Sequence, residues 1–251
     1  MDNTNIENKA TDEKLIVSKD RVKEHGEVYT PSHIVKDMCD LVKDESYDIT
    51  KTFLEPACGN GNFLVELIDR KMQGAKAVTT QFDDLTEFHR NMFQGVASIY
   101  GVDILPDNVA DSRTRMINII TEKYREFTGA EKLPIQIKNV VSKILEYNII
   151  LGNTLTNEQF KLNVETFDRG PRKGEQKIEV ARDACGMPLV DRNITFIEWE
   201  FNTDGNVKCT ESYIEPSDEI VGTQTFDSWR DLKKLEYTEA SKISVADTDI
   251  L

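Results

Sequence analysis

The residues best suited to chemistry lie in the stretch Leu54–Leu64, which reads Leu-Glu-Pro-Ala-Cys-Gly-Asn-Gly-Asn-Phe-Leu. Its two glycines, Gly59 and Gly61, stand one residue apart and predict a tight turn. Such a turn lets a ligand approach the backbone closely, and the N–H groups of a following helix then point at the ligand. The composition therefore favours a loop that binds a nucleotide-like ligand, although two glycines alone are a weak signal.

Elements of regular structure must position this loop. Thr52–Leu54 is apolar and predicts a short buried strand, and Phe63–Ile68 opens an apolar helical pattern. Strand, glycine turn and helix in this order form the unit that holds phosphates and dinucleotides in α/β proteins. The alternative is a loop that binds another nucleotide or nothing.

Glu55-Pro56 in front of Ala57-Cys58-Gly59 makes the loop more specific. It resembles the cofactor-binding loop of S-adenosylmethionine (SAM)-dependent methyltransferases, most closely the adenine-N6 DNA methyltransferases of restriction-modification systems. The resemblance implies a Rossmann-like α/β fold with a mostly parallel sheet and helices on both faces. It implies SAM as cofactor, held by Glu55, Pro56, Ala57, Cys58, Gly59, Asn60 and Gly61.

A segment upstream fits the same family. Gly26–Pro31 ends in Tyr-Thr-Pro, and a helical pattern follows it. Thr30 is forced into an extended conformation by Pro31, and either Thr30 or Ser32 is suited to cap the helix. The resemblance implies that Tyr29, Thr30 and Pro31 close over the methionine end of SAM. An ordinary helix start is the alternative.

Two further strands are predicted downstream. Ala97–Ile104 reads as a buried strand that ends in Asp103, and an acid at this place can accept both hydrogen bonds of a ribose diol. The resemblance implies that Asp103 takes this role and that Ile104 packs on the adenine. Tyr147–Leu155 reads as a third strand, where Asn153 stands in place of the family's usual aspartate. Asn153 is interpreted as a cofactor contact or as part of a plain turn.

The catalytic loop of the family is missing. Adenine-N6 methyltransferases hold the flipped base in a short Asp/Asn-Pro-Pro-Tyr/Phe loop, whereas no two of the seven prolines here are adjacent. Ile194–Thr210 alternates around an Asn-Thr-Asp-Gly turn and predicts a hairpin instead. Phe201 and Asn202 are the candidate catalytic substitutes, with Trp199 as a further aromatic side chain.

Composition narrows the class of protein. The chain has 251 residues, a net charge of −14 and no apolar run of the length that spans a bilayer. Its four cysteines lack metal-ligand spacing, so we expect reduced thiols, no metal and a cytoplasmic protein. The acidity predicts weak DNA binding by the lone chain, helped by a specificity subunit or another protein partner. Arg169–Gly174 is the one compact basic loop, and DNA mimicry is a competing explanation of the charge.

We expect a polar tail at residues 1–20, a methyltransferase-like SAM-binding domain at 21–215 with its core at about 22–155, and an acidic tail with a short helix at 216–251. The leading hypothesis is a SAM-dependent adenine-N6 DNA methyltransferase of a restriction-modification or phage system, reduced or partner-dependent. A catalytically inactive SAM-binding regulatory or assembly module is the second. A methyltransferase that acts on RNA, protein or a small molecule is the third.

Overall fold

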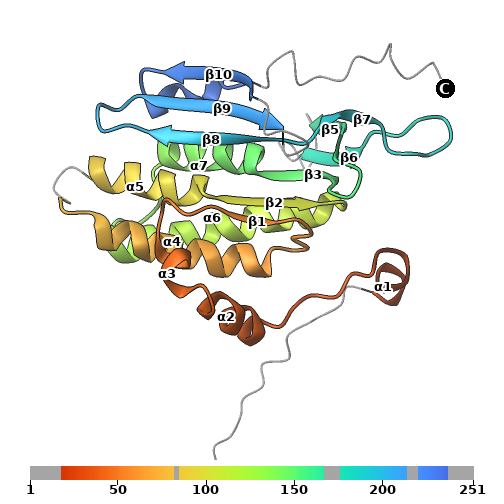
Figure 1. The fold of residues 1–251 in the computed structure, drawn as a ribbon, viewed down its shortest axis with the longest axis horizontal. Coiled ribbons are helices and arrows are strands. Elements are labelled where there is room, and N and C mark those ends of the chain that lie inside the picture. The colour runs from red at the N-terminus through yellow and green to blue at the C-terminus, as the bar shows by residue number, and fades with distance from the viewer. Residues whose placement is uncertain (1–17, 82–84, 167–175, 214–219, 237–251) are drawn as a thin grey trace, which may run out of the picture.

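A computed structural model describes residues 18–81, 85–166, 176–213 and 220–236 (Figure 1). Its central sheet has five strands in the order β1-β2-β3-β4-β7. Strands β1, β2 and β3 run parallel, whereas β4 and β7 add to this sheet in antiparallel fashion. The bounds are β1 Phe53–Glu55, β2 Ile99–Asp103, β3 Ile149–Asn153, β4 Glu158–Phe160 and β7 Val190–Asn193.

Helices connect the parallel strands, as the predicted alternation of strand and helix requires. Helices α4 and α5 lie between β1 and β2, and α6 and α7 lie between β2 and β3. Three shorter helices precede β1. The bounds are α1 Lys19–His25, α2 Ser32–Asp40, α3 Lys43–Tyr47, α4 Asn62–Val78, α5 Thr86–Ala97, α6 Pro106–Thr128 and α7 Ile135–Asn148.

The two faces of the parallel strands are covered differently. On one face a side chain added at Gly101 would meet Leu64 of α4 at 3.2 Å, so this helix packs directly on the sheet. On the other face Val102 and Ile150 form a cluster with Ile194 and Phe196. We predicted helices on both faces, but in the described part of the chain a strand rather than a helix covers this second face. The α/β class and the mostly parallel sheet are confirmed.

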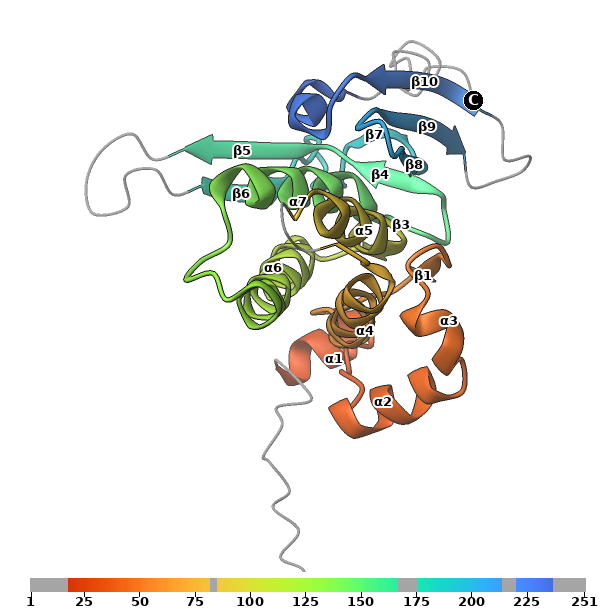
Figure 2. The ribbon, with the colours of Figure 1, turned by 90° about the vertical axis from the view of Figure 1, so that its left-hand side faces the viewer.

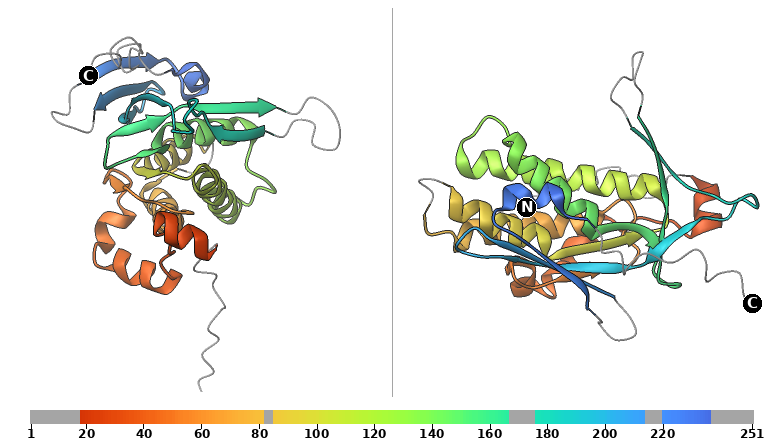
Figure 3. Two further views of the ribbon diagram at one scale, coloured as in Figure 1. Left: turned by 90° about the vertical axis from the view of Figure 1, so that its right-hand side faces the viewer. Right: turned by 90° about the horizontal axis from the view of Figure 1, so that it is seen from above.

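That strand, β8 Thr195–Phe201, belongs to a second sheet. It pairs in antiparallel fashion with β9 Val207–Tyr213, which confirms the predicted hairpin, and β9 pairs with β10 Ile220–Phe226. The Tyr100 hydroxyl donates a hydrogen bond of 2.7 Å to the Ile197 carbonyl and joins the two sheets. Figure 3 shows this sheet beside the central one.

Two further elements complete the described chain. Strands β5 Leu162–Thr166 and β6 Gln176–Val180 form a separate two-stranded ribbon, which Figure 2 shows extending from the body. The short 3-10 helix η1 Trp229–Lys234 follows β10 and packs on α7. Tyr147 of α7 donates a hydrogen bond of 2.8 Å from its hydroxyl to the carbonyl of Leu235, which directly follows η1.

Strand β1 lies at the edge of the central sheet and pairs only with β2 among the described strands. The Phe53 N–H donates to the Ser98 carbonyl at 2.9 Å, on the β2 side. Main-chain groups alternate in direction along a parallel strand, so those of Leu54 point away from β2. The Leu54 side chain is 46% exposed.

A fully buried lysine joins α4 to the segment that leads into β1. The Lys71 ammonium donates to the main-chain carbonyls of Glu45 (3.0 Å), Lys51 (2.7 Å) and Asp48. An ammonium has three N–H donors, so all three are satisfied. The lysine thereby fixes the turn between α3 and β1.

The described helices include none long and apolar enough to cross a membrane.

Candidate functional site

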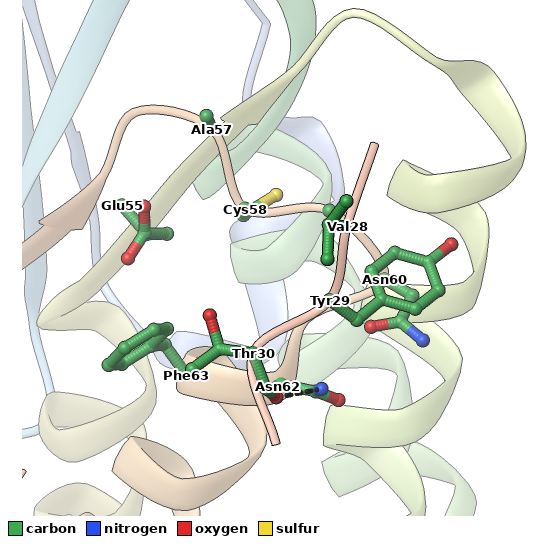
Figure 4. Close-up of a pocket in the computed structure, with 10 residues that line it drawn as sticks. Val28, Tyr29, Thr30, Glu55, Ala57, Cys58, Asn60, Asn62 and Phe63 are labelled. Carbon is green, nitrogen blue, oxygen red and sulfur yellow. Dashed lines mark hydrogen bonds between the residues drawn. The ribbon is translucent and has the colours of Figure 1, made fainter. Parts of the chain in front are cut away.

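A cavity of about 110 Å³ lies at the carboxyl end of β1. The strap, which we define as residues 26–31, covers one side of it, and the loop, residues 55–61, forms the other (Figure 4). Glu55 and Phe63 lie on one side of this space, with Tyr29 and Asn60 on the other. The lining residues are Val28, Tyr29, Thr30, Glu55, Ala57, Cys58, Gly59, Asn60, Asn62 and Phe63.

Hydrogen bonds from outside the cavity hold the loop in place. The Gly59 N–H donates to Asp103 Oδ2 at 2.8 Å, and the Gly59 carbonyl accepts from Ser112 Oγ at 3.0 Å. Arg115 donates to the Asn60 carbonyl at 2.6 Å. Thr154, just after β3, donates to the Pro56 carbonyl at 2.7 Å. The loop is therefore fixed by the ends of β2 and β3 and by side chains of α6.

Gly61 is required by packing. It adopts a φ of +87°, and a Cβ there would lie 2.7 Å from Ser112 Oγ and 3.1 Å from its Cα. The sequence interpretation linked this glycine to contact between backbone and cofactor. The structure shows that α6 occupies the space beside it, so a side chain at Gly61 would disturb the fold as well as the loop.

The strap is anchored at both of its ends. Asn62 Nδ2 donates to the Thr30 carbonyl at 2.8 Å. Glu27 is buried and accepts from Arg21 (2.6 Å), Asn108 Nδ2 (2.8 Å) and the Tyr29 hydroxyl (3.1 Å). Burial acts against the charged carboxylate, but these donors hold the pKa of Glu27 below its ordinary value. The network ties the strap to the first turn of α6.

Tyr29 lies at the centre of this arrangement. Its ring is 3.4 Å from the point where a Cβ would stand on Gly59, so it packs directly on the loop. Burial, followed by the hydrogen bond to Glu27, raises the pKa of Tyr29 to about 12. The hydroxyl therefore stays protonated at neutral pH and remains a donor.

The two acceptors predicted at the ends of β2 and β3, Asp103 and Asn153, lie on neighbouring strands, because the ends of parallel strands meet at one edge. Asp103 accepts from Gly59 and also from the Leu105 N–H (2.9 Å) and Asn108 Nδ2 (3.2 Å). Ile104 is 43% exposed beside it. Asn153 ends β3, and its side chain accepts from the Leu155 N–H at 3.0 Å, as in a polar turn. Neither Asp103, Ile104 nor Asn153 lines the cavity.

The lining is chemically suited to part of a SAM molecule. Asn60 Oδ1 is buried and without a hydrogen-bond partner in the described structure, which leaves an acceptor for a ligand. Glu55 is half-buried, and burial raises the pKa of its carboxyl group. Burial and the charge of Asp103 also raise the pKa of Cys58 to about 12, so its thiol is not a nucleophile. Ligand pockets usually measure about 300–1,000 Å³, so a whole nucleoside would have to extend past the cavity or displace the strap.

The structure places the predicted catalytic candidates away from the cavity. Phe201 packs against Phe93 of α5, with ring centroids 5.8 Å apart, and belongs to the main core. Asn202 stands in the β8–β9 turn, where its N–H donates to the Asn206 carbonyl at 2.9 Å. Trp199 is buried and donates to Asn148 Oδ1 at 2.9 Å. None of them reaches the cavity, because β8 begins over β2 and ends beside α5.

Sequence interpretation missed the supporting residues on α6. Asn108, Ser112 and Arg115 all contact the strap or the loop, and Arg113 donates to the Ile149 carbonyl at 3.1 Å. The detectable signal is the spacing of positions 108, 112 and 115, which places three polar side chains on one helix face.

Comparison with known families agrees with this geometry. Residues 16–119 match the family model of the N-6 DNA methylases. This N-6 DNA methylase segment contains the strap, the loop and Asp103, and it ends within α6. The family predicted from the loop is thus confirmed for less than half of the chain. No curated protein and no solved structure matches the chain.

Proposed function

We propose that this chain is a SAM-dependent adenine-N6 DNA methyltransferase of a restriction-modification or phage system, dependent on a partner polypeptide. The observation that supports the proposal is that the strap and the loop enclose one cavity, while Asp103 holds the loop from outside it through the Gly59 N–H. These elements are separate in the sequence and lie within the N-6 DNA methylase segment. The domain boundaries are proposed as predicted, with the SAM-binding unit at residues 21–215, and the cytoplasm as its compartment.

Each residue has a proposed role toward the cofactor. SAM, when bound, supplies the methyl group. Tyr29, Thr30 and Pro31 cover its methionine end, and Glu55 and Asn60 provide acceptors facing the cavity. Asp103 accepts from the ribose, beside the loop it already holds. Ile104 offers an exposed apolar side chain for the adenine, with Asn153 at the next strand end.

Calorimetry tests the cofactor half of the proposal. We expect SAM and S-adenosylhomocysteine to bind the whole chain and to raise its melting temperature. Asn60→Leu should weaken the binding of both ligands about 5- to 30-fold, because it removes one shielded hydrogen-bond acceptor. Asn163→Leu, at an exposed position of β5, is the matched control and should bind normally. Absence of heat and of thermal stabilisation with both ligands would remove the proposal.

Transfer of labelled methyl groups from SAM to genomic DNA tests the catalytic half. We expect the lone chain to methylate DNA slowly or not at all, because the −14 charge opposes DNA and the cavity lining holds no residue from β8. Activity should appear with a partner subunit and fall steeply as salt rises. Vigorous formation of N6-methyladenine by the lone chain would contradict the partner dependence.

A catalytically inactive SAM-binding module is the second candidate function. It is favoured by the packing of Phe201 on Phe93 of α5 and by the position of Asn202 in the β8–β9 turn, because neither residue lines the cavity. In this case SAM binds with the same dependence on Asn60, but no partner elicits methyl transfer.

A further inference from the structure

A second cavity, of about 260 Å³, lies between the first turn of α7 and the short helix η1. Its lining has an unusual composition for so acidic a protein, with two cationic side chains, two amides, an indole and no carboxylate. The lining residues are Gln136, Asn139, Val140, Trp229, Arg230 and Lys233. We call this cavity the basic pocket.

The two cations of the basic pocket are available to a ligand. Arg230 and Lys233 are exposed, and neither forms an ion pair with another side chain in the described part of the chain. The nearest carboxylate on η1, that of Asp231, is bound instead by Lys234 at 2.7 Å. The basic pocket therefore keeps a local positive charge although the whole chain has a net charge of −14.

An aromatic ring and the start of a helix lie beside these two cations. The guanidinium of Arg230 lies 4.1 Å from the centroid of the Trp229 ring, so a flat cation and an indole face form one platform. Pro134, the N-cap residue of α7, provides no side-chain cap, and the first turn of the helix contains no acid. The N-terminal end of α7, where Gln136 lines the basic pocket, therefore favours an anion.

The basic pocket is held rigidly and lies away from the candidate cofactor site. The Trp229 ring packs on that of Phe93 in α5, with centroids 5.4 Å apart. Helix α5 ends immediately before β2 begins, whereas the cofactor cavity lies where the strands end. A ligand could thus occupy both sites at once.

We propose that the basic pocket binds a backbone phosphate of a nucleic acid strand. A phosphate accepts charge-assisted hydrogen bonds from a guanidinium, an ammonium and amides, and proteins that grip single strands combine such cations with an aromatic face. The basic pocket would allow this acidic chain to bind a nucleic acid strand at one place on its surface. The inference depends on DNA being the substrate in the proposed function.

Tryptophan fluorescence of the whole chain tests the inference. The chain has two tryptophans, and Trp199 is only 3% exposed, so a change caused by a ligand reports on Trp229. We expect a single-stranded DNA oligonucleotide to quench the emission, and affinity to rise with the length of the strand. Inorganic phosphate is a separate arm, because it offers the same chemistry without a strand.

The double variant Arg230→Gln, Lys233→Gln should weaken oligonucleotide binding about 3- to 10-fold and flatten the plot of log affinity against log salt by about 0.7–1.4. The control variant Lys43→Gln, Lys51→Gln changes the net charge equally on α3 and before β1. It should leave both the oligonucleotide affinity and its dependence on salt nearly unchanged.

Equal weakening by the two double variants would overturn the inference, because a general charge effect would then explain the binding. Phosphate that quenches as strongly as the oligonucleotide, without a gain from strand length, would also overturn it. Calorimetry with SAM separates the two proposals. Normal SAM binding without quenching by DNA rejects only the basic pocket, and quenching without SAM binding rejects the proposed function.

Discussion

Replacement of Asp103 by alanine is expected to reduce SAM affinity more than the loss of a ribose contact alone would. The Asp103 carboxylate accepts from Gly59 in the loop and from Leu105 and Asn108 at the start of α6. Alanine removes all three bonds and leaves the Gly59 N–H without its partner. Since a hydrogen bond to a charged group contributes about 1.5–3 kcal/mol, we expect a loss of about 2–4 kcal/mol in the binding free energy by calorimetry.

Asp111→Ala is the control, because it removes an exposed acid from α6, the helix whose first residues Asp103 contacts. It should leave SAM affinity within about twofold. Circular dichroism must show both variants folded. Unchanged affinity in a folded Asp103→Ala protein would show that neither the ribose contact nor the anchoring of Gly59 contributes to binding.

Replacement of Lys71 by methionine is expected to have the largest effect on stability. Methionine fills much of the same space but leaves the partly buried carbonyls of Glu45, Asp48 and Lys51 without their donor. Unsatisfied buried acceptors cost about 1–3 kcal/mol each. We therefore expect the free energy of unfolding in urea to fall by about 2–4 kcal/mol.

The same position predicts a dependence on pH. Burial lowers the pKa of Lys71 from 10.5 to about 8, although Asp48 acts in the opposite direction. Between these values the unfolded chain binds more protons, so the stability of the natural protein should rise relative to Lys71→Met as pH increases from about 8 to 10.5. Lys138→Met, at an exposed position of α7, is the control. A flat difference over this window would show that Lys71 keeps an ordinary pKa.

The sequence predicted those features that local patterns determine. The loop, the strands that begin at Phe53 and Ile99 and the hairpin around residues 202–206 all follow from alternation, apolar runs and turn residues.

Contacts between distant segments could not be predicted in this way. The attachment of the strap to α6 depends on Glu27 and Asn108, which are far apart in the sequence. The same holds for β8, because its apolar alternation does not say which surface it covers. For the same reason the sequence identified Phe201 as an aromatic residue at a strand end but did not predict its packing on Phe93. The basic loop at residues 169–174 lies outside the described residues.

The edge of β1 that pairs with no described strand also bears on how the protein behaves at high concentration. Exposed strand edges invite association with other chains, and natural proteins counter this by keeping them short or placing proline on them. Here β1 spans only Phe53–Glu55, and Pro56, which has no N–H to donate, follows at once. Another molecule could add few main-chain hydrogen bonds to so brief a stretch. The exposed Leu54 therefore adds little risk of aggregation. The free edge of β1 beside the cavity can remain uncovered.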